Sequence, residues 1–147
     1  MNKKERRLNE FCDIGNLEDY KEILQAIFNK IDDANCSISA RDDRGPAIHE
    51  FPNERGSCHI RIPLKTFTNN PIEGIWVILH EFGHHQSGRI DKKQFTKDII
   101  FQREKEAWNF AREELLLFPK LANDILEFNK YAQKCLESYR TNLTATE

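Results

Sequence analysis

The residues of this chain best suited to do chemistry are His80, Glu81 and His84, which form the pattern His-Glu-x-x-His. Residues four positions apart share one face of an α-helix, so both imidazoles can reach a single metal ion. Glu81 is rotated by about 100° from His80 and can reach a water molecule on the same ion. The spacing therefore predicts one zinc ion held by two histidines, with Glu81 as the catalytic general base.

The segment that carries these residues is predicted to be a buried helix. Asn70, Pro71 and Glu73 have the form of a helix start, and Gly88 is a stop signal at the other end. Most positions between them are apolar, which leaves the helix little polar face. Two histidines and a glutamate would be costly in such a helix without a partner, and this cost favours a metal ion over a chance match.

A hydrolytic zinc site needs a third protein ligand, and a second predicted helix, residues 98–118, supplies the candidates. Glu104 lies in the middle of the apolar stripe of this helix, whereas Glu106 is about 160° away among polar residues. Metal binding explains a carboxylate in a face that packs on the core, so Glu104 is the predicted third ligand. The alternatives are Glu106, Asp91, Asp98 or no third ligand.

Other polar side chains are weaker candidates for a role at the metal. His85 adjoins His84 but is rotated away from it, and we expect it at the surface or supporting a ligand from outside. Four further side chains could approach the metal and stabilise an oxyanion: His49, His59, Tyr131 and Tyr139. No residue is predicted to bind substrate.

The remaining elements predict an α+β domain with about four helices. Behind a charged N-terminal arm, residues 1–15, apolar residues at three-and-four spacing predict a helix over residues 16–34. Short runs between turn formers over residues 37–64 predict a short antiparallel sheet between this helix and the buried one. We expect the strand that ends at Leu64 to have an exposed edge for an extended peptide. A last amphipathic helix is predicted after Pro119.

Composition limits the class of protein further. The 147 residues predict a single domain, and 22 basic against 24 acidic residues, a net charge of −2, argue against direct binding to nucleic acid. The apolar runs are far shorter than the roughly 20 residues that span a bilayer, so no membrane partner is expected. Four cysteines without C-x-x-C spacing and the lack of a signal peptide predict reduced, free thiols in a cytoplasmic protein: Cys12, Cys36, Cys58 and Cys135.

Two motifs in order resemble the ImmA/IrrE family of small zinc metallopeptidases. HEFGHH at residues 80–85 is followed by EKEAWNFA at residues 104–111 and by LLLFP at residues 115–119. The family typically has E-x-x-A-N-x-F-A-x-x-L-L-x-P in the second region. Trp108 therefore stands where asparagine is usual, and one extra residue precedes Pro119.

The resemblance implies a gluzincin-like, or zincin-like, fold with one zinc ion on His80, His84 and Glu104 and with Glu81 as general base. These are the residues that spacing and the helical wheel select. The implied activity is that of a zinc metalloendopeptidase acting on a protein substrate, for which a DNA-binding repressor is one candidate. The alternative function is a non-catalytic, zinc-containing regulatory module that binds a protein without cutting it.

Overall fold

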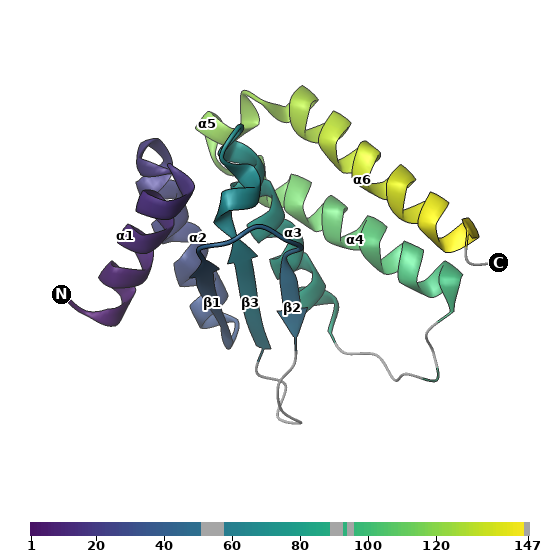
Figure 1. The fold of residues 1–147 in the computed structure, drawn as a ribbon, viewed down its shortest axis with the longest axis horizontal. Helices are drawn as coiled ribbons and strands as arrows, with labels where there is room; N and C mark the ends of the chain where they lie inside the picture. The colour runs from purple at the N-terminus through teal and green to yellow at the C-terminus, as the bar shows by residue number, and fades with distance from the viewer. Residues whose placement is uncertain (51–57, 89–92, 94–95, 146–147) are drawn as a thin grey trace.

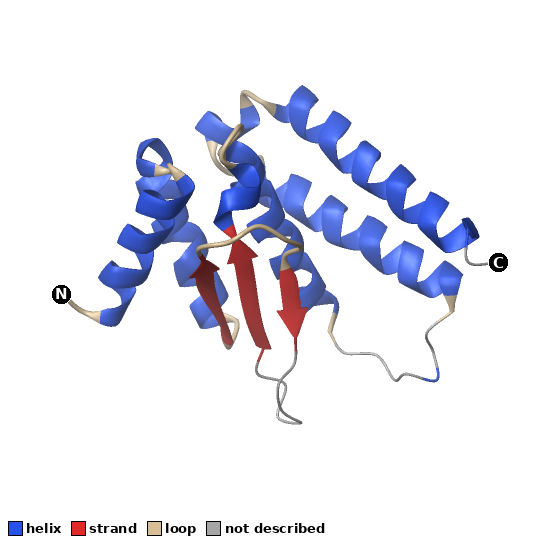
Figure 2. Ribbon diagram, in the orientation of Figure 1, coloured by secondary structure: helices blue, strands red, loops and turns tan. Residues whose placement is uncertain are grey.

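A computed structural model describes residues 1–50, 58–88, 93 and 96–145 of the chain. Over these residues the fold is α+β, as predicted, with a small sheet flanked by helices (Figures 1 and 2). None of the helices described is both long and apolar enough to cross a membrane. The elements are α1 (Lys3–Gly15), α2 (Lys21–Asp33), β1 (Cys36–Arg41), β2 (Ile48–Glu50), β3 (Cys58–Pro63), α3 (Ile72–Ser87), α4 (Lys97–Leu115), α5 (Pro119–Ala122) and α6 (Ile125–Ala145).

The sheet is mixed, and the prediction of an antiparallel sheet is wrong. The strand order is β1-β3-β2, in which β3 is parallel to β1 and antiparallel to β2. The strand that ends near Leu64 is therefore the central one, so the prediction that it offers an exposed edge is also wrong. Alternation of apolar residues fixes which face of a strand is buried, but it fixes neither the neighbour nor the direction of that strand.

The parallel pairing of β1 with β3 also explains an unexpected disulfide. Cys36 and Cys58 lie directly opposite each other in the register, and their sulfur atoms are bonded. The prediction of a free thiol is wrong for this pair, because a sequence separation of 22 residues does not show that two strands will bring them together. Cys12 and Cys135 are free thiols.

The predicted N-terminal arm forms helix α1, and the helix count among the described residues is six instead of about four. Its buried side chains, among them Leu8 and Phe11, are few, which is why charge dominates the sequence there. Arg7 donates two hydrogen bonds of 3.0 Å to the carboxylate of Asp32 and so joins α1 to α2. At the other end of the chain, Pro119 begins the short helix α5, and α6 lies beside α4 (Figure 1).

Helix α3 lies between the sheet and the pair formed by α4 and α6 (Figure 1). Every residue from Gly74 to Gly83 is buried, which confirms the prediction of a buried helix. The helix ends where predicted, since Gly88 has a φ of 79°, a left-handed conformation that favours glycine.

Helices α3 and α4 approach each other most closely at Gly83. A Cβ atom added to Gly83 would lie 2.8 Å from the carbonyl oxygen and 2.9 Å from the Cα atom of Ala107. Side chains do not pack that close to backbone, so the two helices can keep this separation only with glycine here. Ala107, which is fully buried, is the matching small residue on α4.

We expect Gly83→Ala to lower the free energy of unfolding by about 1–3 kcal/mol, because the new methyl group forces α3 and α4 apart. Gly74→Ala in the same helix is the control, since the atoms nearest to its Cβ would be those of the Phe67 side chain, at an ordinary 3.6 Å. This control should be neutral or stabilising by up to about 1 kcal/mol, as alanine is the better helix former. Urea unfolding measures both, and equal effects would contradict the close approach.

Candidate metal centre

The carboxylate of Glu104 lies between the two histidines of α3. Its Oε2 atom is 2.7 Å from Nε2 of His80, and its Oε1 atom is 3.1 Å from Nε2 of His84. All three side chains are largely buried, with exposed fractions of 10%, 17% and 20% for His80, His84 and Glu104. Three side chains of the kinds that bind zinc therefore converge from two helices.

Glu81 lies beside this group and is also buried. Its Oε1 atom is 3.5 Å from Nδ1 of His80, and only 8% of the residue is exposed. One potential ligand atom from each of His80, Glu81 and His84 lies within 4.8 Å of the others. These three residues of α3 form a group that could hold a metal ion. With Glu104, they make up what we call the metal group.

The structure separates the candidates for the third ligand. Glu104 reaches both histidines, whereas Glu106 is exposed and accepts a hydrogen bond of 3.2 Å from Gln102. Asp98 is exposed near the start of α4, and Asp91 lies outside the described residues. The helical wheel predicts that Glu104 faces inward, and α4 buries the apolar residues of the same stripe, namely Ala107, Trp108, Ala111 and Leu115.

The pKa values of His80 and Glu104 move in opposite directions. Burial lowers the pKa of His80, but hydrogen bonds to Glu104 and Glu81 and their negative charges outweigh it and raise the pKa to about 9. Burial raises the pKa of Glu104, but hydrogen bonds from His80 and His84 outweigh it and lower the pKa to about 2. Without a metal ion, a proton on the imidazole thus compensates the charge of the carboxylate.

Trp108 is a residue of the site whose role the sequence did not reveal. Its ring stacks on the imidazole of His80, with centroids 4.1 Å apart and an angle of 23° between the planes. Phe128 and Tyr131 of α6 contact Trp108 edge-on, with centroids 5.9 and 5.8 Å away. Trp108 is itself 4% exposed. Trp108 therefore holds the ring of His80 in place by packing.

The other polar candidates lie apart from this group or cannot be placed. His59 is on the face of the sheet opposite to the buried one, where Ser37 and Ser39 contact its ring nitrogens. The side chains of His49 and Tyr139 lie outside the described part of the structure. The ring of Tyr131 contacts Trp108, which in turn stacks on His80.

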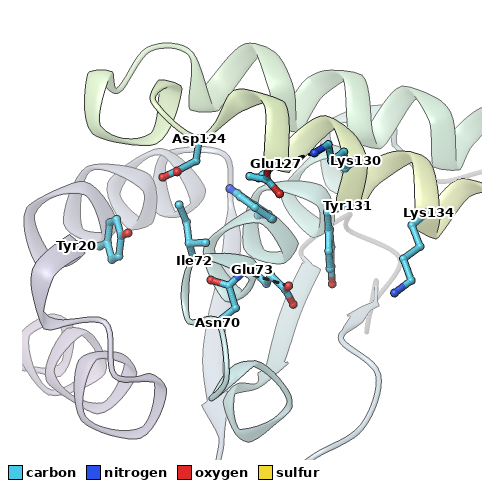
Figure 3. Close-up of a pocket in the computed structure, with 10 residues that line it drawn as sticks. Tyr20, Asn70, Ile72, Glu73, Asp124, Glu127, Lys130, Tyr131 and Lys134 are labelled. Atoms are coloured by element: carbon cyan, nitrogen blue, oxygen red, sulfur yellow. Dashed lines mark hydrogen bonds and ion pairs between the residues drawn. The ribbon is translucent and has the colours of Figure 1, made fainter.

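A pocket of about 440 Å³ lies next to the aromatic residues that support His80 (Figure 3). Glu73 of α3 and Tyr131 and Lys134 of α6 line it, and Figure 3 shows the pocket between these two helices. Trp76 also lines it, and Trp76 precedes His80 by one helical turn, about 6 Å along the axis. The pocket carries both acidic and basic side chains, and none of His80, Glu81, His84 and Glu104 lines it.

Comparison of the chain with models of known protein families, with curated proteins and with solved structures gives no match.

The opposed pKa shifts predict how the stability of the metal-free protein depends on pH. His80 has its pKa raised from 6.5 to about 9, so the stability that this shift contributes is complete below pH 6.5 and is lost as the pH rises to about 9. Glu104 has its pKa lowered from 4.5 to about 2, so its contribution is complete above pH 4.5 and is lost as the pH falls to about 2. The free energy of unfolding, measured in urea with a chelator present, should fall as the pH is raised from 6.5 to about 9 and also as it is lowered from 4.5 to about 2.

Glu104→Gln removes the carboxylate that raises the pKa of His80, so its stability should decline much less between pH 6.5 and 9. Glu106→Gln is the matched control on the same helix and should behave like the wild type. The same decline in all three proteins would show that His80 and Glu104 are not coupled as described.

Proposed function

We propose that this chain is a zinc-dependent peptidase of the ImmA/IrrE type, in which His80, His84 and Glu104 hold one zinc ion. The observation that carries the proposal is the position of the Glu104 carboxylate, whose two oxygens lie 2.7 and 3.1 Å from Nε2 of His80 and of His84. Two imidazoles and a carboxylate are the protein ligands of one group of catalytic zinc sites, in which a fourth position stays open. The two motifs that resemble the family contain the same residues.

The ion, when bound, would supply a Lewis acid that polarises a peptide carbonyl and activates water. Glu81 follows His80 directly and is not needed to complete the ligand set. Its carboxylate would take the proton of the attacking water and then donate that proton to the nitrogen of the leaving amine. A site that only holds structure has no use for such a base, so the buried Glu81 favours hydrolysis over the non-catalytic binding module.

An extended protein substrate needs a surface beside the metal group, and two features support one. In the described part of the sheet, β2 is an edge strand and contacts α3, so its free backbone groups could pair with a peptide. The pocket between Glu73 and Lys134 would then take substrate side chains. A DNA-binding repressor as the protein cut remains a proposal that rests on the family resemblance.

Glu81→Gln should retain zinc but lose hydrolysis, because the amide preserves the shape of the side chain and cannot accept a proton. General acid–base catalysis typically contributes about 10²–10⁴-fold, and we expect a loss in that range. Wild type and variant, each loaded with one equivalent of zinc, would be incubated with the product of a neighbouring gene and with a proteome-derived peptide library. Mass spectrometry of new peptide termini measures cleavage. Equal cleavage by both proteins would contradict the assigned role of Glu81.

The ligand set is tested by Glu104→Gln against Glu106→Gln. Loss of an outer hydrogen-bonding partner costs a metal site roughly 10–100-fold in affinity, and loss of the ligand Glu104 should cost more than that. Glu106 is exposed and should tolerate the same change without effect on affinity. Zinc affinity is measured by competition with a fluorescent chelator. Unchanged affinity in Glu104→Gln would remove Glu104 from the ligand set.

A further inference from the structure

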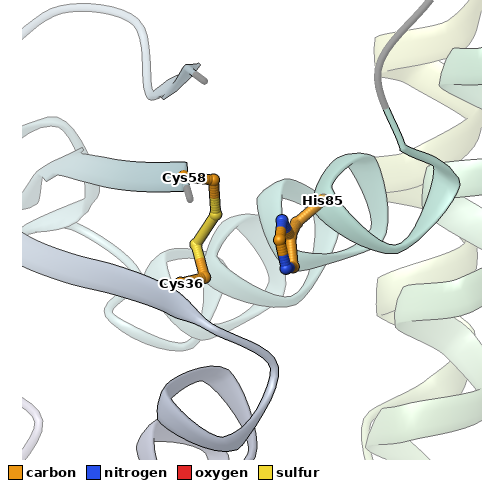
Figure 4. Close-up of side chains that lie close together, drawn as sticks. All are labelled: Cys36, Cys58 and His85. Carbon is orange, nitrogen blue, oxygen red and sulfur yellow. A yellow bond between two sulfur atoms is a disulfide. The ribbon is translucent and has the colours of Figure 1, made fainter. Parts of the chain in front are cut away.

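A second group of potential metal ligands lies on another side of α3. Cys36 begins β1, Cys58 begins β3, and His85 lies in the last turn of α3. One potential ligand atom from each lies within 4.8 Å of the others. Figure 4 shows the disulfide and the imidazole side by side, with the nitrogen-bearing edge of the ring turned toward the sulfur atoms. Three separate elements therefore bring two sulfur atoms and a ring nitrogen together.

This group is distinct from the one that contains Glu104. His84 and His85 are successive residues of a helix, so their side chains point in directions about 100° apart. His84 faces Glu104 on α4, whereas His85 contacts the carbonyl oxygen of Ala34 just before β1. The last turn of α3 thus contributes one histidine to each of two separate groups.

We propose that Cys36, Cys58 and His85 form a redox-gated zinc site, which is a disulfide when oxidised and a set of zinc ligands when reduced. Thiolate sulfur and imidazole nitrogen are the ligands that structural zinc sites use, and soft thiolates favour zinc over magnesium or calcium. The proposal does not depend on the peptidase activity, because it uses none of the residues assigned to that activity.

The surroundings of the three residues fit a metal site. Cys36 and Cys58 are 6% and 3% exposed, so bulk water would not compete freely for the ion. A carbonyl oxygen can only accept a hydrogen bond, so Nε2 of His85 must donate to Ala34, at 2.7 Å. In the neutral imidazole this leaves the lone pair on Nδ1, the proposed ligand atom. Histidines that bind metals commonly donate their other ring N–H group to a carbonyl in this way.

The strands can accommodate both states without a change in register. The Cα atoms of Cys36 and Cys58 are 4.7 Å apart, held by the ladder between β1 and β3. With Zn–S distances of about 2.3 Å, the two sulfur atoms must separate beyond bonding distance. Rotation of the two side chains can supply this movement. Three protein ligands then leave a fourth position for water.

The chemistry of the switch balances with a dithiol as reductant. The dithiol is oxidised to its disulfide, and its two electrons and two protons break the Cys36–Cys58 bond to give two thiols. Zinc then displaces both thiol protons and binds the two thiolates and His85, which releases two protons to solvent. Loss of zinc and transfer of two electrons to a disulfide oxidant restore the Cys36–Cys58 bond.

Cobalt(II) titration of the full chain tests the proposal, because thiolate ligands give cobalt an intense near-ultraviolet charge-transfer absorption that nitrogen and oxygen ligands do not. The experiment uses His80→Ala, which removes one of the three proposed zinc ligands of the peptidase site, so that cobalt binding reports on the second group. After reduction by a dithiol and its anaerobic removal, this variant should bind one equivalent of cobalt with the thiolate band. The oxidised variant should show no thiolate band. Wild type should bind one more equivalent when reduced than when oxidised.

Matched cysteine variants locate the signal. Cys36→Ser and Cys58→Ser should each abolish the thiolate band, while Cys12→Ser and Cys135→Ser should keep it. Persistence of the band in the first pair, or its loss in Cys135→Ser alone, would overturn the assignment. Reduced protein that binds cobalt without any thiolate band would also overturn it. If the peptidase proposal failed instead, the thiolate band would be unaffected, so the two failures are distinguishable.

A measurement on the wild type alone guards against variants that do not fold. Zinc added to the reduced protein should slow alkylation of Cys36 and Cys58 by iodoacetamide at least about tenfold, as peptide mass spectrometry reports for each site. Alkylation of Cys12 should be unchanged. Equal alkylation of Cys36 and Cys58 with and without zinc would contradict the site even if every variant misfolded.

Discussion

The separation between α3 and α4 is the constraint on which the rest of this structure depends. A glutamate side chain is short, and Glu104 must reach Nε2 of two histidines that stand one turn apart on the opposite helix. It can do so because Gly83, which lies between these histidines in sequence, lets the backbone of Ala107 come within contact distance. The unspecified positions of the His-Glu-x-x-His pattern therefore do not accept any residue in this chain. Gly83 occupies the second of them and sets the separation between α3 and α4 across which the side chains meet.

Close packing alone would leave two imidazoles and two carboxylates buried at a high cost, and the structure limits this cost in two ways. Glu104 and His80 form a hydrogen-bonded ion pair. This pair keeps the carboxylate charged and the imidazole protonated when no metal is present. Trp108 covers the ring of His80 and fixes its plane. The ligands are therefore held near one another before any ion arrives. This differs from small zinc modules, in which the metal itself drives folding.

The sequence predicted which helix residues come together better than it predicted the sheet, for a physical reason. His80, His84 and Glu104 lie on helices, where the spacing of residues fixes the face they share, and the apolar stripe shows which face turns inward. No comparable rule holds for strands. Alternation predicts that Ile60 is buried and Arg61 is exposed, but it does not determine which strand pairs with β3 or in which direction. The disulfide was missed for the same reason, because it depends on a parallel register that the pattern does not determine.

That parallel register also gives the last turn of α3 two neighbours with different chemistry. On the side of α4, Glu104 holds His84 and the Arg103 side chain donates to the carbonyl oxygen of Gly88. On the side of the sheet, the carbonyl oxygen of Ala34 holds His85. One turn of helix thus presents two histidines to two different elements, because successive residues point in directions about 100° apart. The sulfur atoms beside His85 and the carboxylate beside His84 are therefore neighbours of the same helix turn.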